Sequence, residues 1–177
     1  MLRSKESKKF LTIYEICIFA LLGTIMYCSK MLMEALPNIH LLGMFTMVCA
    51  IVYRFKGLIP IYVYVFLQGL LSGFSLWWVP YLYIWTVLWG ITMLIPKNIP
   101  DKIAVFVYPI VCGLHGLMFG TLFAPVQAIA FGYDFNMMIK WIIAGLPFDA
   151  VHCIGDLLAG ILVLPVAKIL KKISYKR

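Results

Sequence analysis

The chain has 177 residues, of which 64% are hydrophobic and 12% are charged. Soluble globular proteins have about 45–50% apolar and about 25% charged residues, so this composition excludes an ordinary soluble domain and predicts an all-α membrane protein. A spanning helix takes about 20 residues, so the length predicts a six-transmembrane-helix bundle in a single membrane domain, residues 1–177. No room remains for a nucleotide-hydrolysing domain, and the chain has no G-x-x-x-x-G-K-[ST] phosphate loop.

Apolar runs bounded by charged residues, Pro or Gly give the positions of the six predicted spans. In chain order they lie near residues 11–33, 40–53, 57–75, 79–95, 103–130 and 147–169. The second is short, so we expect it to be tilted, partly re-entrant or buried among its neighbours. The fifth is expected to break or turn at Pro125. Residues 137–143 are expected to form a short interfacial helix that ends at Gly145, with Pro147 opening the sixth span.

The formal net charge of +8 is distributed unevenly along the chain. Most Lys and Arg residues fall in four clusters that the six-span arrangement places on one side: Arg3/Lys5/Lys8/Lys9, Arg54/Lys56, Lys97/Lys102 and Lys168/Lys171/Lys172/Lys176/Arg177. Only Lys30 and Lys140 remain for the other side. The positive-inside rule therefore predicts that both termini are cytoplasmic, and the charge indicates contact with a lipid bilayer and not with nucleic acid.

Ionisable residues inside a span are costly, which makes them functional candidates. The sixth predicted span contains Asp149, His152 and Asp156. Their offsets of three and four place them on one helical face, which descends about 10 Å inward from the outer end. We predict that this face contacts a ligand. The alternative is that Asp149 stabilises a helix N-terminus and His152 bonds to a neighbouring helix, which leaves Asp156 poorly explained.

Aromatic residues of the fourth span form the second candidate feature. Tyr81, Trp85 and Trp89 are spaced i, i+4, i+8 and share one face, which would offer flat stacking surfaces with polar tips. Ordinary helix packing explains the same spacing. Trp78 fits either this binding surface or an aromatic belt at the membrane boundary.

Other polar residues complete the predicted binding set. Gln68 lies in the middle of the third span, while Asn38 and His40 lie in an outer turn that would form a gating loop over a pocket. The three histidines, at 40, 115 and 152, fall on separate elements without His-x-x-x-His or His-Glu-x-x-His spacing. The sequence therefore predicts neither a metal site nor a cofactor.

Small residues on the first span form a stripe of Ala20, Thr24 and Cys28. Such a stripe permits the close approach of another helix, either from within the protein or from an external partner.

Several segments together resemble the substrate-binding S components of energy-coupling factor (ECF) transporters. They are the small-residue stripe, Pro-Asn-Ile at 37–39, Gly-Phe-Ser-Leu-Trp-Trp-Val-Pro-Tyr at 73–81 and, most specifically, Gly-Leu-Pro-Phe-Asp-Ala-Val-His-Cys-Ile-Gly-Asp at 145–156. The resemblance implies a binding subunit, not an enzyme, in the bacterial plasma membrane. It implies a pocket for a vitamin, vitamin precursor or related micronutrient, open to the outside and covered by the first and third outer loops. Members of this family often carry Asn at the position of Asp156.

The resemblance also implies partners. A membrane coupling subunit would dock on the face of Ala20, Thr24 and Cys28, and two cytoplasmic ATPase subunits would supply the energy for uptake.

The sequence leaves three candidate functions for the protein. The first is a transport subunit that binds a small heterocycle, because two carboxylates would repel a simple carboxylate solute. The second is an intramembrane enzyme that acts on lipid or peptide through Asp149, His152 and Asp156, although no recognised catalytic spacing is present. The third is an assembly subunit without a ligand.

Overall fold

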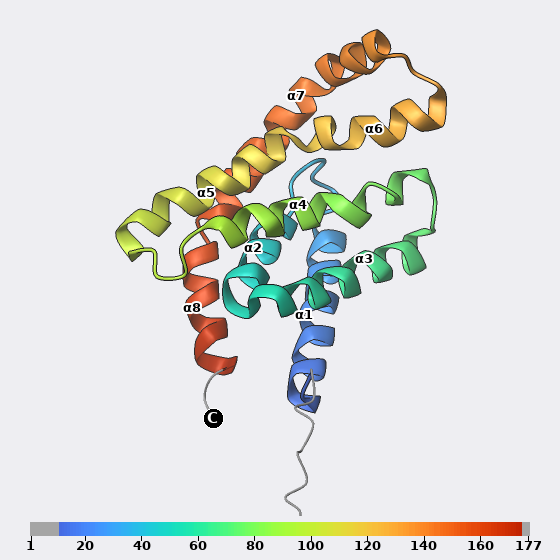
Figure 1. Cartoon of the computed structure of the whole chain (residues 1–177). Helices are drawn as coiled ribbons and strands as arrows, with labels where there is room; N and C mark the ends of the chain where they lie inside the picture. Colours follow the sequence, from blue (N-terminus) through green and yellow to red (C-terminus); the bar gives the residue numbers. More distant parts are fainter. Residues whose placement is uncertain (1–10, 175–177) are drawn as a thin grey trace, which may run out of the picture.

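The computed structural model describes residues 11–174, and the regular structure within this range is helical throughout (Figure 1). The elements are α1 (Ile13–Leu32), α2 (Leu42–Tyr53), the 3-10 turn η1 (Arg54–Gly57), α3 (Leu58–Ser72), the 3-10 turn η2 (Leu76–Trp78), α4 (Tyr81–Leu94), α5 (Asp101–Leu117), α6 (Phe119–Phe131), α7 (Phe135–Gly160) and α8 (Val163–Ser174). The basic residues at 3–9 and 176–177 lie outside the described residues.

Four helical segments of the described chain are long and apolar enough to cross a membrane. They are Ile13–Leu32, Leu42–Ser72, Asp101–Phe131 and Phe135–Gly160. The segment Leu42–Ser72 contains the second and third predicted spans, joined by η1. Helix α4, with 14 residues, extends about 21 Å, which is shorter than a usual span. The structure therefore supports a helical membrane protein.

Helix α1 begins at a capping box. The Thr12 side chain accepts a hydrogen bond from the Glu15 N–H, and the Glu15 carboxylate accepts one from the Thr12 N–H. Glu15 also pairs with Lys56 of η1 at 2.6 Å. Farther along, Gly23 lets α1 lie close against α3, because a Cβ at this position would collide with Val63. Helix α1 is therefore held against η1 near its beginning and against α3 near its middle.

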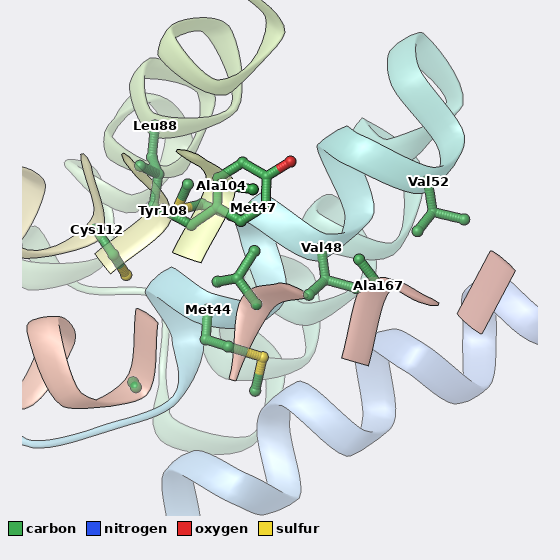
Figure 2. Close-up of a cluster of buried hydrophobic side chains, with 11 residues drawn as sticks. Met44, Met47, Val48, Val52, Leu88, Ala104, Tyr108, Cys112 and Ala167 are labelled. Carbon is green, nitrogen blue, oxygen red and sulfur yellow. The ribbon is translucent and has the colours of Figure 1, made fainter. Parts of the chain in front are cut away.

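Helix α2 is the central helix of the protein. Nine of its 12 residues are buried, and it contributes side chains to both hydrophobic clusters. One cluster joins it to α1, α3 and α4. The other, drawn in Figure 2, joins Met44, Met47 and Val48 of α2 to residues of α4, α5, α7 and α8. The short second predicted span is thus buried among its neighbours, which is one of the three alternatives considered for it.

Helix α2 ends at Tyr53, and the next residue, Arg54, has a positive φ of 55°. Its guanidinium donates a hydrogen bond to the carbonyl of Met93, and its own carbonyl accepts one from the indole N–H of Trp89. Both partners belong to α4. The end of α2 is therefore fixed against the second half of α4.

The fifth predicted span is divided at a different place from the one expected. Helix α5 ends at Leu117 and α6 begins at Phe119, whereas Pro125 lies inside α6. The N–H of Met118 is shared among the carbonyls of Leu114, His115 and Gly116, so the last turn of α5 tightens and the helix ends there. The expected break at Pro125 is wrong, because a single missing N–H is tolerated within a supported membrane helix.

The sixth predicted span also differs from the expectation. A single helix, α7, continues through Gly145 and Pro147, so the separate interfacial helix of residues 137–143 is wrong. Asp134 begins α7 by accepting the N–H of Met137, and Gly145 keeps a helical backbone. The glycines of the described chain with positive φ are Gly73 and Gly132, and these follow the ends of α3 and α6.

Near its other end the predicted span 147–169 is interrupted after Gly160. This glycine packs on the backbone of Pro109 in α5, and the chain turns at residues 161–162 before α8 begins. Helix α8 buries Val163 and Ala167 on one face and carries lysines on the other. It is an amphipathic helix and not the continuation of a uniformly apolar span.

The beginning of α1 and the end of α8 lie side by side, at the bottom of the view in Figure 1. The hydroxyl of Tyr14 donates a hydrogen bond to the carbonyl of Ile173, and Tyr53 bonds to Ser174 at 2.6 Å. Between α4 and α7 lies the loop of residues 33–41 that joins α1 to α2 (Figure 1). This loop covers the candidate site.

Candidate functional site

Asp149, His152 and Asp156 are all buried on the protein-facing side of α7. Their exposed fractions are 5%, 3% and 0%. The face of α7 that carries them packs against α5 and α6, while neighbouring residues such as Val151 and Ile154 point outward. Burial of two carboxyl groups and an imidazole in an apolar helix bundle is costly unless each has a partner.

A second histidine, His40, reaches the same place from the loop of residues 33–41. Its Nδ1 atom lies 3.9 Å from Oδ1 of Asp156, while Nε2 of His152 lies 3.7 Å from Oδ2 of Asp156. The two imidazole rings meet edge to face, with 4.6 Å between their centroids. We refer to these three residues as the His40–His152–Asp156 cluster.

The cluster contains four buried polar atoms without a hydrogen-bond partner among residues 11–174. They are Nδ1 of His40, Nε2 of His152 and both carboxylate oxygens of Asp156. Separations of 3.7–3.9 Å are too long for direct hydrogen bonds. Buried polar groups in folded proteins are nearly always paired, so four converging atoms without partners indicate a site for a ligand.

Two glycines make room for the Asp156 carboxylate. A Cβ atom at Gly43 of α2 would lie 3.0 and 3.1 Å from its two oxygens, and one at Gly116 of α5 would lie 3.1 Å from Oδ2. These distances are too short for ordinary contacts, so glycine is required at both positions for this packing. The first residues of α2 and the last turn of α5 therefore shape the site.

Asp149 has a different environment. Its Oδ1 atom accepts a hydrogen bond of 3.0 Å from the N–H of Gly120, the second residue of α6. A carboxylate is stabilised at a helix N-terminus by the unpaired N–H groups and the helix dipole. The other oxygen, Oδ2, is buried without a partner. Part of the role of Asp149 is thus to hold the start of α6. The alternative considered from the sequence placed Asp149 at the start of its own helix, whereas the residue lies inside α7.

Aromatic rings surround the cluster. The ring of Phe119 lies 4.5 Å from that of His152, and Trp85 lies 5.8 Å from His40 between ring centroids. Tyr81 contacts both Trp85 and Phe119. The structure therefore brings two members of the predicted aromatic face, Tyr81 and Trp85, to the polar cluster.

A cavity of about 200 Å³ opens above the cluster, beneath the loop of residues 33–41. It is lined by Lys30, Met33, Glu34, Leu36, Pro37, Asn38, Ile39, His40, Tyr81, Phe119 and His152. At its rim Lys30 and Glu34 form an ion pair of 3.8 Å. Asn38 holds the loop in a left-handed turn with φ of 60°, a conformation that Asn adopts more readily than most residues. The predicted gating turn thus lies over a pocket.

Burial lowers the pKa of the His40 imidazole to about 4, with a smaller contribution from the neighbouring charges of His115 and Lys30. The ring is therefore neutral at physiological pH. A neutral imidazole can donate a hydrogen bond from one nitrogen and accept one, or bind a metal ion, at the other.

Four of the ten predicted site residues line this cavity, namely Asn38, His40, Tyr81 and His152. Three of the other six have contacts that connect or stabilise neighbouring elements. The Trp78 indole N–H is bonded to the carbonyl of Val65, and that of Trp89 to the carbonyl of Arg54, so both connect neighbouring elements. The Gln68 amide donates to Ser72 within α3. Helix packing, the alternative considered for Trp89, accounts for its position.

The small-residue stripe of α1 faces outward. Ala20, Thr24 and Cys28 are exposed, while Phe19, Leu22, Gly23 and Met26 carry the inward contacts of the same helix. The Thr24 hydroxyl is bonded to the carbonyl of Ala20, so it presents no free donor. The stripe is therefore not used for packing within the described chain.

Sequence reasoning missed Phe119 and the glycines at 43, 116 and 120. Phe119 stands in an apolar run with no polar neighbour to single it out. The packing role of a glycine within a helix can be recognised only when the residue that packs against it is known. His115, noted as a polar residue of the fifth span, bonds through Nε2 to the Ile84 carbonyl of α4 at 3.2 Å.

Comparison with protein families, with curated proteins and with solved structures finds no match to this chain.

Proposed function

We propose that the protein is the substrate-binding membrane subunit of an ECF-type importer and captures a small heterocyclic micronutrient from outside the cell. The observation that carries this proposal is the convergence of four buried, unpartnered polar atoms at the base of a cavity beneath the loop of residues 33–41. Such a cavity, mostly apolar with a few convergent polar groups, is typical of small-molecule sites.

The lining suits a flat solute with hydrogen-bond donors. Tyr81 and Phe119 supply rings to the lining of the cavity, and the two buried oxygens of Asp156 lie next to the lining residues His40 and His152 as acceptors. The volume of about 200 Å³ is below the usual range of about 300–1,000 Å³ for ligand pockets. The solute is therefore small, in the size range of a vitamin fragment, vitamin precursor or nucleobase.

The proposal includes six spans with both termini in the cytoplasm of a bacterial cell. The adjacent ends of α1 and α8 are consistent with termini on one side, and the clusters of Lys and Arg assign this side to the cytoplasm. The segment Leu42–Ser72 then supplies two spans, and α4 a short one.

Uptake against a gradient requires energy that this chain does not supply. We propose that a membrane coupling subunit docks on Ala20, Thr24 and Cys28 and connects the protein to two cytoplasmic ATPase subunits. The exposure of all three residues supports this assignment. Small residues on an outward face let a partner helix approach closely.

Thermal unfolding of the detergent-purified protein with a panel of vitamins, vitamin precursors and nucleobases tests the proposal. The buffer contains a metal chelator, so that only organic ligands are scored. A ligand at 100 times its Kd adds about 2.7 kcal/mol to the free energy of unfolding. We expect one class of heterocycle to raise the midpoint.

Two histidine variants make this test specific. His152→Ala and His115→Ala each remove a buried imidazole, so both lower the midpoint without ligand. Only His152→Ala is expected to lose the shift caused by the ligand. Turnover of a lipid or peptide by the purified chain alone would contradict the proposal and favour the intramembrane enzyme, and an unresponsive protein would favour the assembly subunit.

A further inference from the structure

We infer that the His40–His152–Asp156 cluster binds a divalent transition-metal ion that enters from the cavity beneath the loop of residues 33–41. This inference goes beyond the proposed function, because it assigns a metal ion to the base of the site where the heterocycle is proposed to bind. It departs from the expectation, drawn from sequence spacing, that the chain has no metal site.

The geometry is close to that of a metal centre. One potential ligand atom from each of the three residues lies within 4.8 Å of the other two. Bonds of about 2.1 Å in a tetrahedral site separate neighbouring ligand atoms by about 3.4 Å. The distance from Oδ1 of Asp156 to His40, 3.9 Å, and that from Oδ2 to His152, 3.7 Å, exceed this value by half an ångström or less, and separations in the set reach up to 4.8 Å. Side-chain rotations that bring the three ligand atoms closer together would complete the coordination.

The unsatisfied atoms are the atoms that a metal ion would use. Nδ1 of His40, Nε2 of His152 and the oxygens of Asp156 point toward one another, and the protein provides none of them with a hydrogen bond. A buried carboxylate without a cation or donor is strongly unfavourable. A divalent cation would give all three residues a partner at once and balance the negative charge.

The donor set selects the class of ion. Two imidazoles and one carboxylate suit Zn²⁺, Fe²⁺, Co²⁺ and Ni²⁺, whereas Mg²⁺ and Ca²⁺ prefer oxygen ligands alone. Three protein ligands leave at least one coordination position open, as in zinc sites that exchange their fourth ligand. A structural zinc site, by contrast, usually has four protein ligands.

The cavity adjoins the cluster. His40 and His152 both line the cavity, whereas Asp156 lies below them with no exposed surface. A volume of about 200 Å³ corresponds to roughly six water molecules at about 30 Å³ each, which is enough for a partly hydrated ion. The ion is thus bound at the base of an entry path and not sealed in the core.

The test is a titration of tag-free, full-length protein with Co²⁺ after removal of metals by a chelator. We expect one Co²⁺ per chain, with the visible absorption of a low-symmetry Co²⁺ site, and displacement by Zn²⁺. Loss of an outer-shell partner typically weakens metal binding about 10–100-fold, so loss of a direct ligand in His152→Ala or Asp156→Asn should weaken it more than about 100-fold. His115→Ala, which removes a buried histidine outside the cluster, should bind Co²⁺ as the wild type does.

The possible results separate this inference from the proposed function. Absence of Co²⁺ binding, or binding that persists unchanged in Asp156→Asn and His152→Ala, overturns the metal site. A heterocycle that binds in the presence of chelator while Co²⁺ does not bind would leave the proposed function intact and the metal inference refuted. Binding of Co²⁺ that depends on His152 and Asp156 supports the metal site, whatever the organic panel shows.

Discussion

Asp156 is the residue with the least favourable surroundings in the described chain. Its carboxyl group has no exposed surface and no hydrogen bond, and Gly43 and Gly116 leave space for it from two sides. A side chain in such a place reduces the stability of the empty protein. This cost is explained if the carboxylate is retained for its contact with a ligand.

The unliganded Asp156→Asn variant should be at least as stable as the wild type. The neutral amide fits the same space and replaces a carboxyl group that is costly to ionise there, so the free energy of unfolding should stay close to the wild-type value or rise. Binding of the ligand should be lost. Thermal unfolding with and without ligand measures both effects, and Asp101→Asn at an exposed ion pair is the matched control. A much less stable variant would show that Asp156 has a structural partner in the empty protein.

The glycine at 120 should be required for the contact between α6 and Asp149. A Cβ at this position would collide with Oδ2 of Asp149, so Gly120→Ala should destabilise the protein by about 1–3 kcal/mol. Gly145→Ala is the control, because no atom lies near its Cβ position and alanine favours the helix by up to about 1 kcal/mol. Equal midpoints for the two variants in thermal unfolding would argue against the Asp149 contact.

At the level of individual residues, the sequence predicted that Asp149, His152 and Asp156 belong to the site, but it did not predict their partners. The offsets of Asp149, His152 and Asp156 place them on one helical face in any α-helix that contains them. The approach of His40 depends on how the loop of residues 33–41 folds back over α7. No local pattern encodes this tertiary contact.

Among the elements, α2 and α7 show what hydropathy can and cannot predict. The apolar run at 40–53 predicted a helix of nearly the right length, and its shortness matched a helix buried in protein. The glycine and proline at 145 and 147 predicted a boundary that does not exist. Neither residue ends a helix by itself, because the termini are decided by which carbonyls and N–H groups find other partners.

The exposed small-residue stripe of α1 is the proposed docking surface for the coupling subunit, and a substitution there tests this proposal. Ala20→Phe fills the exposed small-residue stripe, so it should prevent copurification with the coupling subunit and abolish uptake. It should not change ligand binding or the unfolding midpoint, because Ala20 makes no inward contact. Ala130→Phe, at an exposed alanine of α6, is the matched control and should copurify normally. Copurification of the Ala20→Phe variant at wild-type levels would exclude this face as the docking surface.

For the whole molecule, the proposed orientation gives a prediction about the two sides of the membrane. In a parent lacking the five native cysteines, Asn136→Cys should react with a membrane-impermeant maleimide in intact cells. Asn98→Cys, on the connection between α4 and α5, should react only after the cells are opened. Both side chains are exposed, so accessibility within the protein does not limit the reaction. Labelling of Asn98→Cys in intact cells would show that the orientation is opposite to the proposed one.

Composition was sufficient to predict a helical membrane protein, because few charges and long apolar runs leave little other choice. The path of the chain was less predictable. The breaks between α5 and α6 and between α7 and α8 lie next to Gly116 and Gly160, which pack against residues distant in sequence. Such contacts are visible only in three dimensions.

The most direct test of the central claim is to identify what the protein carries when it is purified from cells. Wild-type protein and Asp156→Asn are extracted in mild detergent and denatured, and the released ions and small molecules are quantified by elemental and organic mass spectrometry. The account predicts a ligand in a near-stoichiometric amount in the wild type and its loss from the variant. Equal contents in the two proteins, or no ligand in either after growth in a complete medium, would contradict a binding site at this cluster.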